Sequence, residues 1–266
     1  MVKDIYKTSF KDTEYDKDVE LNKSIELIDK LEKKRSLSLE EYRYLLENLN
    51  EEVFDYISKK ARILGDENYG KDIYLRGLIE ISNICKNDCY YCGIRHSNSN
   101  CDRYRLSEDE ILECADEGYR LGYRTFVMQG GEDGKFEPEY ICDIVRKIKN
   151  KYKDVAVTLS LGEYERDEYQ KMFDAGADRY LLRHETADKA HYEKLHPKQM
   201  SFDHRMKCLQ DLKEIGFQVG CGFMVGSPYQ SSATLAKDLK FIEEFGPHMC
   251  GIGPFIPHHD TAFRDE

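Results

Sequence analysis

The sequence predicts an α/β protein whose main part is a TIM-like (βα) barrel, preceded by a group of helices. Two observations predict this fold. From residue 74 onward, short apolar runs alternate with segments in which apolar residues recur at helical spacing, a pattern typical of parallel strands joined by helices. Several of the apolar runs also end in glycine-rich or ionisable residues, and α/β barrels carry their chemistry at the carboxyl ends of their strands.

The composition excludes several classes of partner. The chain has 266 residues, 40% of them hydrophobic, which is enough for a sizeable core. Charged residues make up 34% and the net charge is −11, so neither a nucleic acid nor an anionic membrane surface is an expected partner. No run approaches the ~20 apolar residues of a membrane span, and residues 1–23 are too polar for a signal peptide. Nine cysteines in such a chain predict free thiols in a reducing cytoplasm.

The first part of the chain is expected to be helical but not part of the barrel. Residues 1–22 are charged and nearly without periodicity, which predicts a flexible N-terminal arm. An N-terminal helical segment follows over residues 23–73, with helices expected at 23–34, 39–48 and 50–64. Gly65 and Gly70 mark the end of this segment.

Residues 74–266 form the predicted barrel. Strands are expected at residues 77–82, 124–129, 155–161, 178–182, 218–224 and 249–253, and helices at 107–121, 138–151, 165–175, 187–195, 202–215 and 231–245. Ser107 and Glu110 have the spacing of a capping box at the start of the first of these helices. Six strands are visible and no helix follows the sixth, whereas a closed TIM barrel has eight strands, so we expect the barrel to lack its C-terminal part.

Three cysteines on the loop after the first expected strand are the most informative feature of the chain. Cys85, Cys89 and Cys92 have the spacing C-x3-C-x2-C, and Tyr91 precedes the last of them. Three thiolates are one fewer than the four that close an iron–sulfur cluster or a structural zinc site. A cluster held in this way keeps one iron open to a ligand, as a catalytic metal centre requires. The alternatives are a chance spacing and a zinc knuckle.

The second expected strand ends in a glycine pair followed by a carboxylate. Gly130 and Gly131 let the backbone approach a ligand closely, and Glu132 supplies a negative charge for an ammonium group. Glycine pairs are common in turns, so this signal gains its weight from lying one βα unit after the cysteines.

The fourth expected strand ends in three ionisable residues, Arg183, His184 and Glu185. Side chains at the ends of several strands meet at one face of a barrel, which predicts a role in the same site. A solvated loop is the alternative for this triplet. Arg205 follows on a predicted helix, where a surface ion pair is the more common role for an isolated arginine.

The last two expected strands and the tail give weaker signals. Residues 220–226 are rich in glycine, so a ligand or another backbone is expected close against them, and the backbone of residues 252–258 could meet a flat base edge. His258 and His259 would suit a metal ion, but a pair of histidines in a tail is more often solvated. Six further cysteines lack ligand spacing, and most are expected to be small core residues: Cys101, Cys114, Cys142, Cys208, Cys221 and Cys250.

The cysteine motif, with its aromatic residue and its place after the first strand, resembles the radical S-adenosylmethionine (radical SAM) superfamily. Longer strings resemble the HydE family, the radical SAM maturases of [FeFe]-hydrogenase, over roughly residues 23–266; they are residues 76–83, 92–95, 157–163, 177–187 and 251–257. Biotin synthase and methylornithine synthase are similar in the cysteine motif and in parts of the barrel.

The resemblance implies roles for individual residues. Cys85, Cys89 and Cys92 match the ligands of a [4Fe–4S] cluster whose open iron binds S-adenosylmethionine (SAM). The residues that match the SAM site are Tyr91, Gln129, Gly130, Gly131, Glu132, Glu185, Arg205 and Ile256. Those that match the wall of the substrate cavity are Arg76, Thr158, Ser160, Arg183 and Met249. The resemblance assigns no separate catalytic acid, base or nucleophile.

The resemblance also implies an activity. It is the reductive cleavage of SAM to methionine and a 5′-deoxyadenosyl radical, in the assembly of the dithiomethylamine bridge of the hydrogenase active site. The expected substrate is a cysteine-bound iron carbonyl–cyanide precursor, and the expected partners are the other hydrogenase maturases and an electron donor. The alternatives are an activity like that of biotin or methylornithine synthase and a non-catalytic iron–sulfur scaffold. An incomplete barrel is also expected to cleave SAM poorly or without coupling to product.

Overall fold

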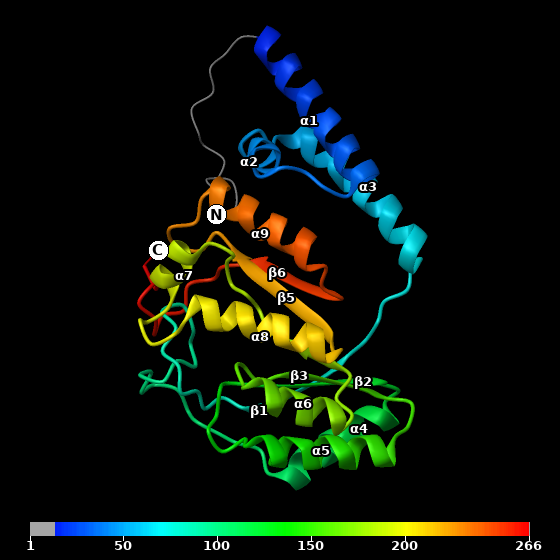
Figure 1. Cartoon of the computed structure of the whole chain (residues 1–266), viewed down its shortest axis with the longest axis vertical. Helices are drawn as coiled ribbons and strands as arrows, with labels where there is room; N and C mark the ends of the chain where they lie inside the picture. Colours follow the sequence, from blue (N-terminus) through cyan, green and yellow to red (C-terminus); the bar gives the residue numbers. More distant parts are fainter. Residues whose placement is uncertain (1–13, 266) are drawn as a thin grey trace. The chain divides into compact units, whose positions relative to one another are not determined.

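The computed structural model describes the backbone of residues 14–265 and the side chains of residues 19–265 (Figure 1). The chain divides into two compact units, Met1–Asp72 and Ile73–Glu266. The boundary expected from the sequence lies between residues 73 and 74. Each unit is described separately below.

From residue 14 onward, the first unit contains three helices, α1 (Glu14–Lys34), α2 (Leu39–Glu47) and α3 (Glu51–Tyr69). The Ser38 side chain caps α2 and the Asn50 side chain caps α3, which explains where these helices begin. Lys60 of α3 binds two carboxylates of α1, Asp29 at 2.9 Å and Glu32 at 2.7 Å.

The predicted N-terminal arm is wrong for residues 14–22, because these residues belong to α1. The helix contains neither glycine nor proline and is rich in Glu, Lys and Leu, so high helix propensity continues it beyond its apolar face. The remainder of the predicted arm, residues 1–13, lies outside the described residues.

The second unit is built on one parallel sheet of six strands. They are β1 (Gly77–Ser82), β2 (Thr125–Gly130), β3 (Ala156–Ser160), β4 (Arg179–Leu181), β5 (Gln218–Val225) and β6 (Met249–Pro254). The spatial order of the strands is the order along the chain, β1-β2-β3-β4-β5-β6, and every neighbouring pair is parallel. This is the arrangement of successive (βα) units, so the predicted α/β fold with six strands is confirmed.

Helices α4 to α9 connect the strands: α4 (Glu108–Arg120), α5 (Pro138–Lys151), α6 (Arg166–Asp174), α7 (Lys189–Leu195), α8 (Phe202–Ile215) and α9 (Ser232–Phe245). Alternate residues of the strands, among them Phe126, Met128, Val157 and Leu159, are fully buried with the apolar faces of these helices in one core. The predicted capping box of Ser107 and Glu110 starts α4. Within the described part of the chain, no helix is both long and apolar enough to cross a bilayer.

The other face of the sheet carries polar side chains. Because successive residues of a strand point to opposite faces, Thr158 and Ser160 point away from the core that contains Val157 and Leu159. Thr158 is only 3% exposed, yet its Oγ1 has no hydrogen-bond partner. An unpaired buried hydroxyl is unfavourable in a core but suits a surface that receives a polar ligand.

Candidate functional site

The three cysteines lie on a long loop between β1 and α4, which we call the cysteine loop (residues 83–104). None of these residues belongs to a helix or strand, and all three thiols are half-buried and free. Distant segments hold the loop. The amide of Tyr90 donates to the carbonyl of Leu195 at the end of α7, and the Cys89 thiol lies 3.6 Å from the Met200 sulfur. The strand and the segment after α7 therefore fix the positions of the cysteines together.

The three thiols form one electrostatic group. Burial raises the pKa of Cys89, and the neighbouring Cys92 and Cys85 raise it further, whereas Arg205 lowers it. Burial also raises the pKa of Cys92, against a hydrogen bond from the Ile94 backbone. The three sulfur atoms do not lie mutually within the 4.8 Å that would suit a single ion, since among the described residues only another group meets that limit. The three sulfur atoms therefore do not form a ready-made site for a single ion.

The loop after β2 packs directly against the cysteine loop. The Lys86 amide donates to the Glu132 carbonyl at 2.9 Å, and the Lys86 ammonium lies 3.2 Å from the Glu132 carboxylate. A Cβ on Gly131 would lie 2.4 Å from the Ile84 carbonyl oxygen and 2.7 Å from the Cys85 Cβ. Only glycine fits there, because the backbone at Gly131 packs against the cysteine loop; its predicted approach to a ligand stays a prediction. Glu132 already binds one ammonium group, that of Lys86.

The segment after β3 makes room for Glu132. Gly162 has φ +85, and a Cβ on it would lie 2.0 Å from Glu132 Cγ, so a residue with a side chain is excluded on both counts. The hydroxyl groups of Tyr180 and Tyr169 donate to the Gly162 carbonyl at 2.9 and 3.2 Å and hold this turn in place. Gly162 was not among the site residues that the sequence predicts, because its role depends on a side chain from the preceding βα unit.

Tyr91, the aromatic residue of the motif, is fixed by a histidine. The Nδ1 of His196 lies 2.9 Å from the Tyr192 carbonyl and must donate to it, so Nε2 accepts from the Tyr91 hydroxyl at 3.0 Å. Burial lowers the pKa of His196 to about 4, which keeps this ring neutral at pH 7. Burial raises the pKa of Tyr91 well above its usual value. The contact orients the residue that lies between Tyr90 and Cys92.

The side chains of the three residues after β4 point in two directions: Arg183 and Glu185 lie together, and His184 points toward α9. Arg183 Nη2 lies 3.5 Å from the carboxylate of Glu185, and Glu185 Oε2 is buried without a hydrogen-bond partner. The negative charge of Glu185 acts on Cys89, Cys92 and Tyr91, which places it beside the cysteines. The side chain of His184 is buried elsewhere, with its Nε2 3.6 Å from Asp238 of α9. The expectation of three side chains at one site thus holds for Arg183 and Glu185 but is wrong for His184.

Asp238 is a supporting residue that the sequence analysis missed. It is fully buried, and its Oδ1 accepts from the Ala187 amide at 2.5 Å while facing His184. His184 Nδ1 accepts from the Gly222 amide, so the ring proton lies on Nε2, toward Asp238. Between these anchors, Glu185 has the left-handed φ of 64° that side chains rarely adopt. A carboxylate among the apolar residues of α9 is the signal that could have identified it.

Replacing Asp238 by leucine is expected to destabilise the protein by about 1–3 kcal/mol, because the buried amide of Ala187 loses its acceptor. Asparagine has the same shape and keeps one oxygen acceptor, so Asp238→Asn should lose less. Urea unfolding of the two variants beside the unchanged protein measures the difference. A leucine variant as stable as the unchanged protein would contradict the anchoring role.

Arg205 is buried rather than on the surface. It lies on α8 with 8% of its surface exposed, and its Nε is 2.5 Å from Glu163 Oε1. Burial would lower the pKa of Arg205, but the charge of Glu163 and the neighbouring Tyr192, Glu132 and Tyr91 outweigh it and raise the pKa. The alternative of a surface ion pair is therefore excluded, and Arg205 joins the cysteines and Glu132 in one group. Glu163 is a second residue that the sequence analysis did not single out.

The remaining predicted residues are divided between the carboxyl and the amino ends of the strands. Gln129 and Gly130 end β2, and Ser160 ends β3. Arg76 directly precedes β1 and Met249 begins β6, so both lie at the amino ends of strands, away from the cysteine loop. Ile256 follows β6 and is 75% exposed. The structure thus gathers the cysteines with Glu132, Glu185 and Arg205, but not all the predicted cavity residues.

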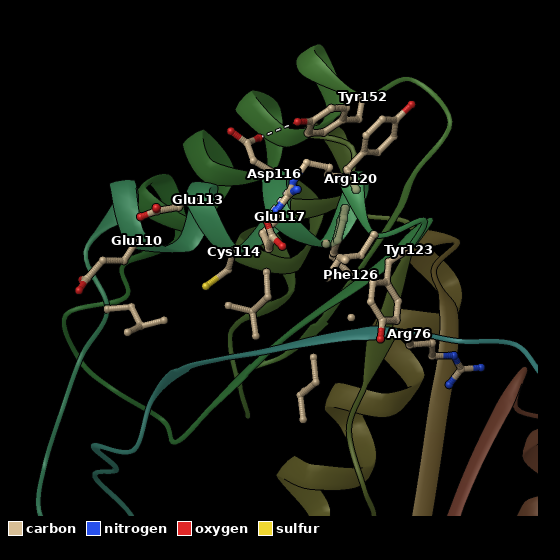
Figure 2. Close-up of a pocket in the computed structure, with 17 residues that line it drawn as sticks. Arg76, Glu110, Glu113, Cys114, Asp116, Glu117, Arg120, Tyr123, Phe126 and Tyr152 are labelled. Atoms are coloured by element: carbon tan, nitrogen blue, oxygen red, sulfur yellow. Dashed lines mark hydrogen bonds and ion pairs between the residues drawn. The ribbon is translucent and has the colours of Figure 1, made fainter.

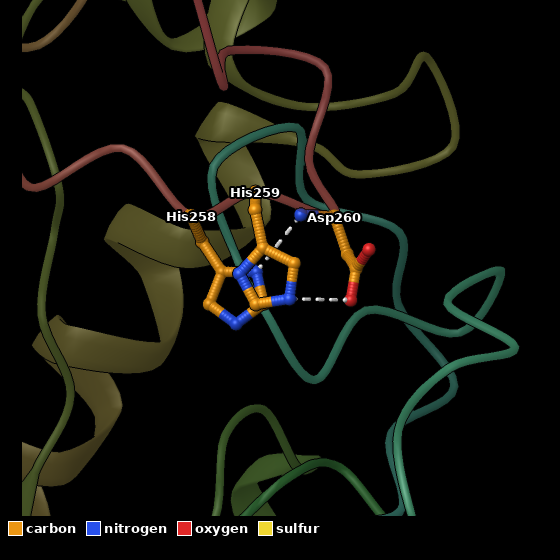
Figure 3. A group of neighbouring side chains, drawn as sticks. All are labelled: His258, His259 and Asp260. Atoms are coloured by element: carbon orange, nitrogen blue, oxygen red, sulfur yellow. Dashed lines mark hydrogen bonds and ion pairs between the residues drawn. The ribbon is translucent and has the colours of Figure 1, made fainter.

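The tail histidines do not form a convincing metal site. The ligand atoms of His258, His259 and Asp260 lie within 4.8 Å of one another, but Figure 3 shows the two imidazole rings stacked, with centroids 4.3 Å apart and planes at 21°. Lone pairs of stacked rings run parallel and cannot converge on one ion, and His258 Nδ1 already accepts from the Asp260 amide. The His258 ring instead packs on Gly93 of the cysteine loop, where a Cβ would lie 2.8 Å away.

A groove of the second unit lies away from the cysteine loop. It has a volume of about 1150 Å³ and runs between the start of β1 and helix α4, with Arg76, Cys114 and Tyr123 among its lining residues (Figure 2). Asp116 and Tyr152 are hydrogen-bonded at its rim, at 2.7 Å. No residue of the cysteine loop lines it, so it is separate from the candidate site.

The predicted core role of the other cysteines is correct for Cys142, Cys208 and Cys221, but wrong for Cys114 and Cys250, which are exposed, and Cys101 is half-buried.

Comparison with known sequences gives consistent matches. The family model of the radical SAM superfamily matches residues 79–242 of this chain. The [FeFe] hydrogenase maturase subunit HydE of Thermotoga maritima is 44% identical over 91% of this chain and 68% of its own length. A 3-methylornithine synthase of Methanosarcina acetivorans is 29% identical over 86% of this chain and 65% of its own, and a biotin synthase of Magnetococcus marinus is 29% identical over 60% and 50%. The chain spans about two thirds of the length of the first two proteins.

Comparison with solved structures supports the same assignment. Methylornithine synthase (PylB) superposes with a TM-score of 0.82 and 26% identity, over 90% of this chain and 71% of that one. HydG, a maturase of the [FeFe]-hydrogenase, has a TM-score of 0.77 over 94% of this chain and 61% of that one, and at 24% identity it shows the fold alone. The sequence match over more than half of the chain and the likeness to HydE show that this protein belongs to the radical SAM superfamily of enzymes.

Proposed function

We propose that this protein binds a [4Fe–4S] cluster through Cys85, Cys89 and Cys92 and cleaves SAM at that site. One observation carries the proposal. Three thiols lie on a single strand-end loop, and the charges of Glu185, which follows β4, and of Arg205, on α8, both act on the Cys89 thiol. A ligand that bears both an ammonium and a carboxylate group needs protein partners of both signs, and this group supplies them.

The residues present fit the cofactor and the ligand. The donors are three thiols, which suit iron, and they are too far apart for one ion. Gly131 leaves its backbone open beside Cys85, and Gly162 keeps the Glu132 side chain in place. The buried Oε2 of Glu185 lies 3.5 Å from Arg183 Nη2 but accepts no hydrogen bond, so it can accept one from a ligand. When bound, the cluster supplies the electron that breaks a carbon–sulfur bond of SAM, giving methionine and a 5′-deoxyadenosyl radical.

The chain's own residues bind and orient SAM in this proposal. Glu132 and the backbone after β2 hold the amino group, as Glu132 already holds the ammonium of Lys86. Arg205 binds the carboxylate of SAM. The other residues assigned to the SAM site by family resemblance are Tyr91, Gln129, Gly130, Gly131, Glu185 and Ile256. The neutral His196 fixes the Tyr91 hydroxyl, so that this side chain does not rotate into the space of the ligand.

The similarity to HydE supports a role in assembling the [FeFe]-hydrogenase active site, including its dithiomethylamine bridge. The substrate in this proposal is a cysteine-bound iron carbonyl–cyanide precursor, and the partners are the other hydrogenase maturases and an electron donor. The polar face of the sheet would receive this substrate, with Thr158, Ser160 and Arg183 as its assigned residues. The family resemblance also assigns Arg76 and Met249, which lie at the amino ends of β1 and β6, away from the cysteine loop. The nine free thiols suit a reducing cytoplasm, where we place this chemistry.

The test is an anaerobic assay of the reconstituted protein. With dithionite and SAM, we expect 5′-deoxyadenosine and methionine to appear in equal amounts, and a cysteine-derived iron substrate to increase their rate of formation. A protein that holds the cluster but forms no 5′-deoxyadenosine would instead be a non-catalytic scaffold. SAM cleavage that ignores this substrate would favour an activity like that of methylornithine or biotin synthase, which the similarity to those enzymes keeps as the alternative.

A further inference from the structure

The cysteine loop has no regular hydrogen-bonded structure of its own. Residues 83–104 belong to no helix or strand, so their carbonyl groups need partners from side chains or turns. A loop that must hold three sulfur ligands in fixed positions also needs its two ends kept together.

The guanidinium of Arg103 makes four hydrogen bonds to backbone carbonyls of this loop. Nη1 donates to Asn83 at 2.6 Å and to Ile94 at 2.9 Å. Nη2 donates to Arg95 at 2.6 Å and to Asn98 at 3.2 Å. No carboxylate within ion-pair distance of Arg103 is found among the described residues, so its positive charge is directed to carbonyl oxygens. The half-buried side chain thus serves the loop alone.

The four acceptors lie on both sides of the cysteines. Asn83 precedes Cys85, and the other three carbonyls follow Cys92 within six residues. The Arg103 side chain therefore joins the beginning of the loop, before Cys85, to the residues that follow Cys92, and so closes the chain around the three thiols. Asn83 also joins the two ends of the loop, because its side chain donates to the Asp102 carbonyl at 2.8 Å and accepts from the Tyr104 amide at 2.8 Å. Arg103 differs from these contacts in that it also reaches the carbonyls that follow Cys92.

We propose that Arg103 is a positioning residue that keeps Cys85, Cys89 and Cys92 in the arrangement that accepts the cluster. This inference rests on the proposed function, because it concerns the same cysteines. The planar fork of arginine is needed, since two separate Nη atoms each reach two carbonyls. Lysine would carry the charge on one nitrogen with three donors and could not span all four acceptors.

The experiment compares Arg103→Met and Arg103→Lys with a matched control, Arg124→Met. Arg124 also donates to two backbone carbonyls, of Tyr119 and Tyr123, but lies at the other end of α4 and pairs with Asp154. After anaerobic reconstitution, iron and sulfide per chain and the electron paramagnetic resonance spectrum of the reduced protein are measured. We expect Arg103→Met to lose most of the cluster, Arg103→Lys to recover part of it, and Arg124→Met to match the unchanged protein.

A second measurement uses the protein before reconstitution and does not depend on the cluster. The rate at which a thiol reagent alkylates the cysteines of the loop should rise several-fold in Arg103→Met, while the buried Cys142 and Cys208 stay protected if the fold is intact. Equal cluster content, spectrum and alkylation rates in Arg103→Met and the unchanged protein would overturn this inference alone. An unchanged protein that takes up no cluster would overturn the proposed function and, with it, this inference.

Discussion

Replacing Cys85, Cys89 and Cys92 together by alanine is expected to give a folded protein that takes up no [4Fe–4S] cluster. The charges of Cys85 and Cys92 both act on the Cys89 thiol, whereas Cys221 and Cys250, also in contact, are only a pair and lie on β5 and β6. The side chains are half-buried, so alanine removes sulfur without leaving a large cavity in the core. Iron and sulfide content after anaerobic reconstitution, with the brown absorption of the cluster, measures the result.

The matched control is Cys101→Ala. Cys101 lies on the same loop, is half-buried like the three ligands, and accepts a weak hydrogen bond from Asn83 at 3.5 Å. It should retain the full cluster. If the triple variant still held a complete cluster, the assignment of the ligands would be wrong, whereas loss in the control as well would show that any change in this loop prevents loading.

The second large effect is expected at Arg205. Arg205→Ala should weaken SAM binding by roughly ten-fold or more, because loss of a buried charged contact costs about 2–5 kcal/mol and about 1.4 kcal/mol corresponds to ten-fold in affinity. The substitution also removes the partner that the half-buried Glu163 carboxylate has at 2.5 Å and leaves it only His204 Nε2, at 3.5 Å. Isothermal titration of the cluster-loaded protein with SAM measures the affinity.

A double variant separates the two consequences. In Arg205→Ala with Glu163→Gln, the unpaired negative charge is gone, so the stability lost in the single variant should be recovered in part. SAM affinity should stay low in the double variant if Arg205 binds the ligand carboxylate directly. Recovery of affinity together with stability would show that Arg205 acts only by neutralising Glu163.

The sequence predicts most of the fold because the local patterns are strong. The bounds of β1 (Gly77–Ser82), α5 (Pro138–Lys151) and α8 (Phe202–Ile215) agree with the expected residues. The beginning of α1 was missed because its first turns lack an apolar face, and Val19 there is 55% exposed. β4 is shorter than expected because only two of its residues pair with β3, Arg179 and Tyr180.

The site is predictable only where its residues share a segment. The cysteine spacing and the glycine pair with Glu132 are local patterns and could be found without a structure. The contacts Arg205–Glu163 and His184–Asp238 join segments far apart in the chain, so no spacing of residues along the sequence predicts them. His184 was misplaced because the alternation of side chains along β4 and its extension directs it to α9, opposite to its neighbours Arg183 and Glu185.

The order of the strands has a consequence for how the protein is made. Because spatial order equals chain order, each strand can pair with the preceding one as the chain leaves the ribosome. The contacts of Arg103 are also local, within residues 83–103, and can form early. Other contacts of the loop can form only later in synthesis. The Tyr90 amide needs the carbonyl of Leu195, and Gly93 packs against the ring of His258. The cysteines thus gain their final support only after β6 has been synthesised, and we expect cluster insertion to follow synthesis of the sheet rather than accompany it.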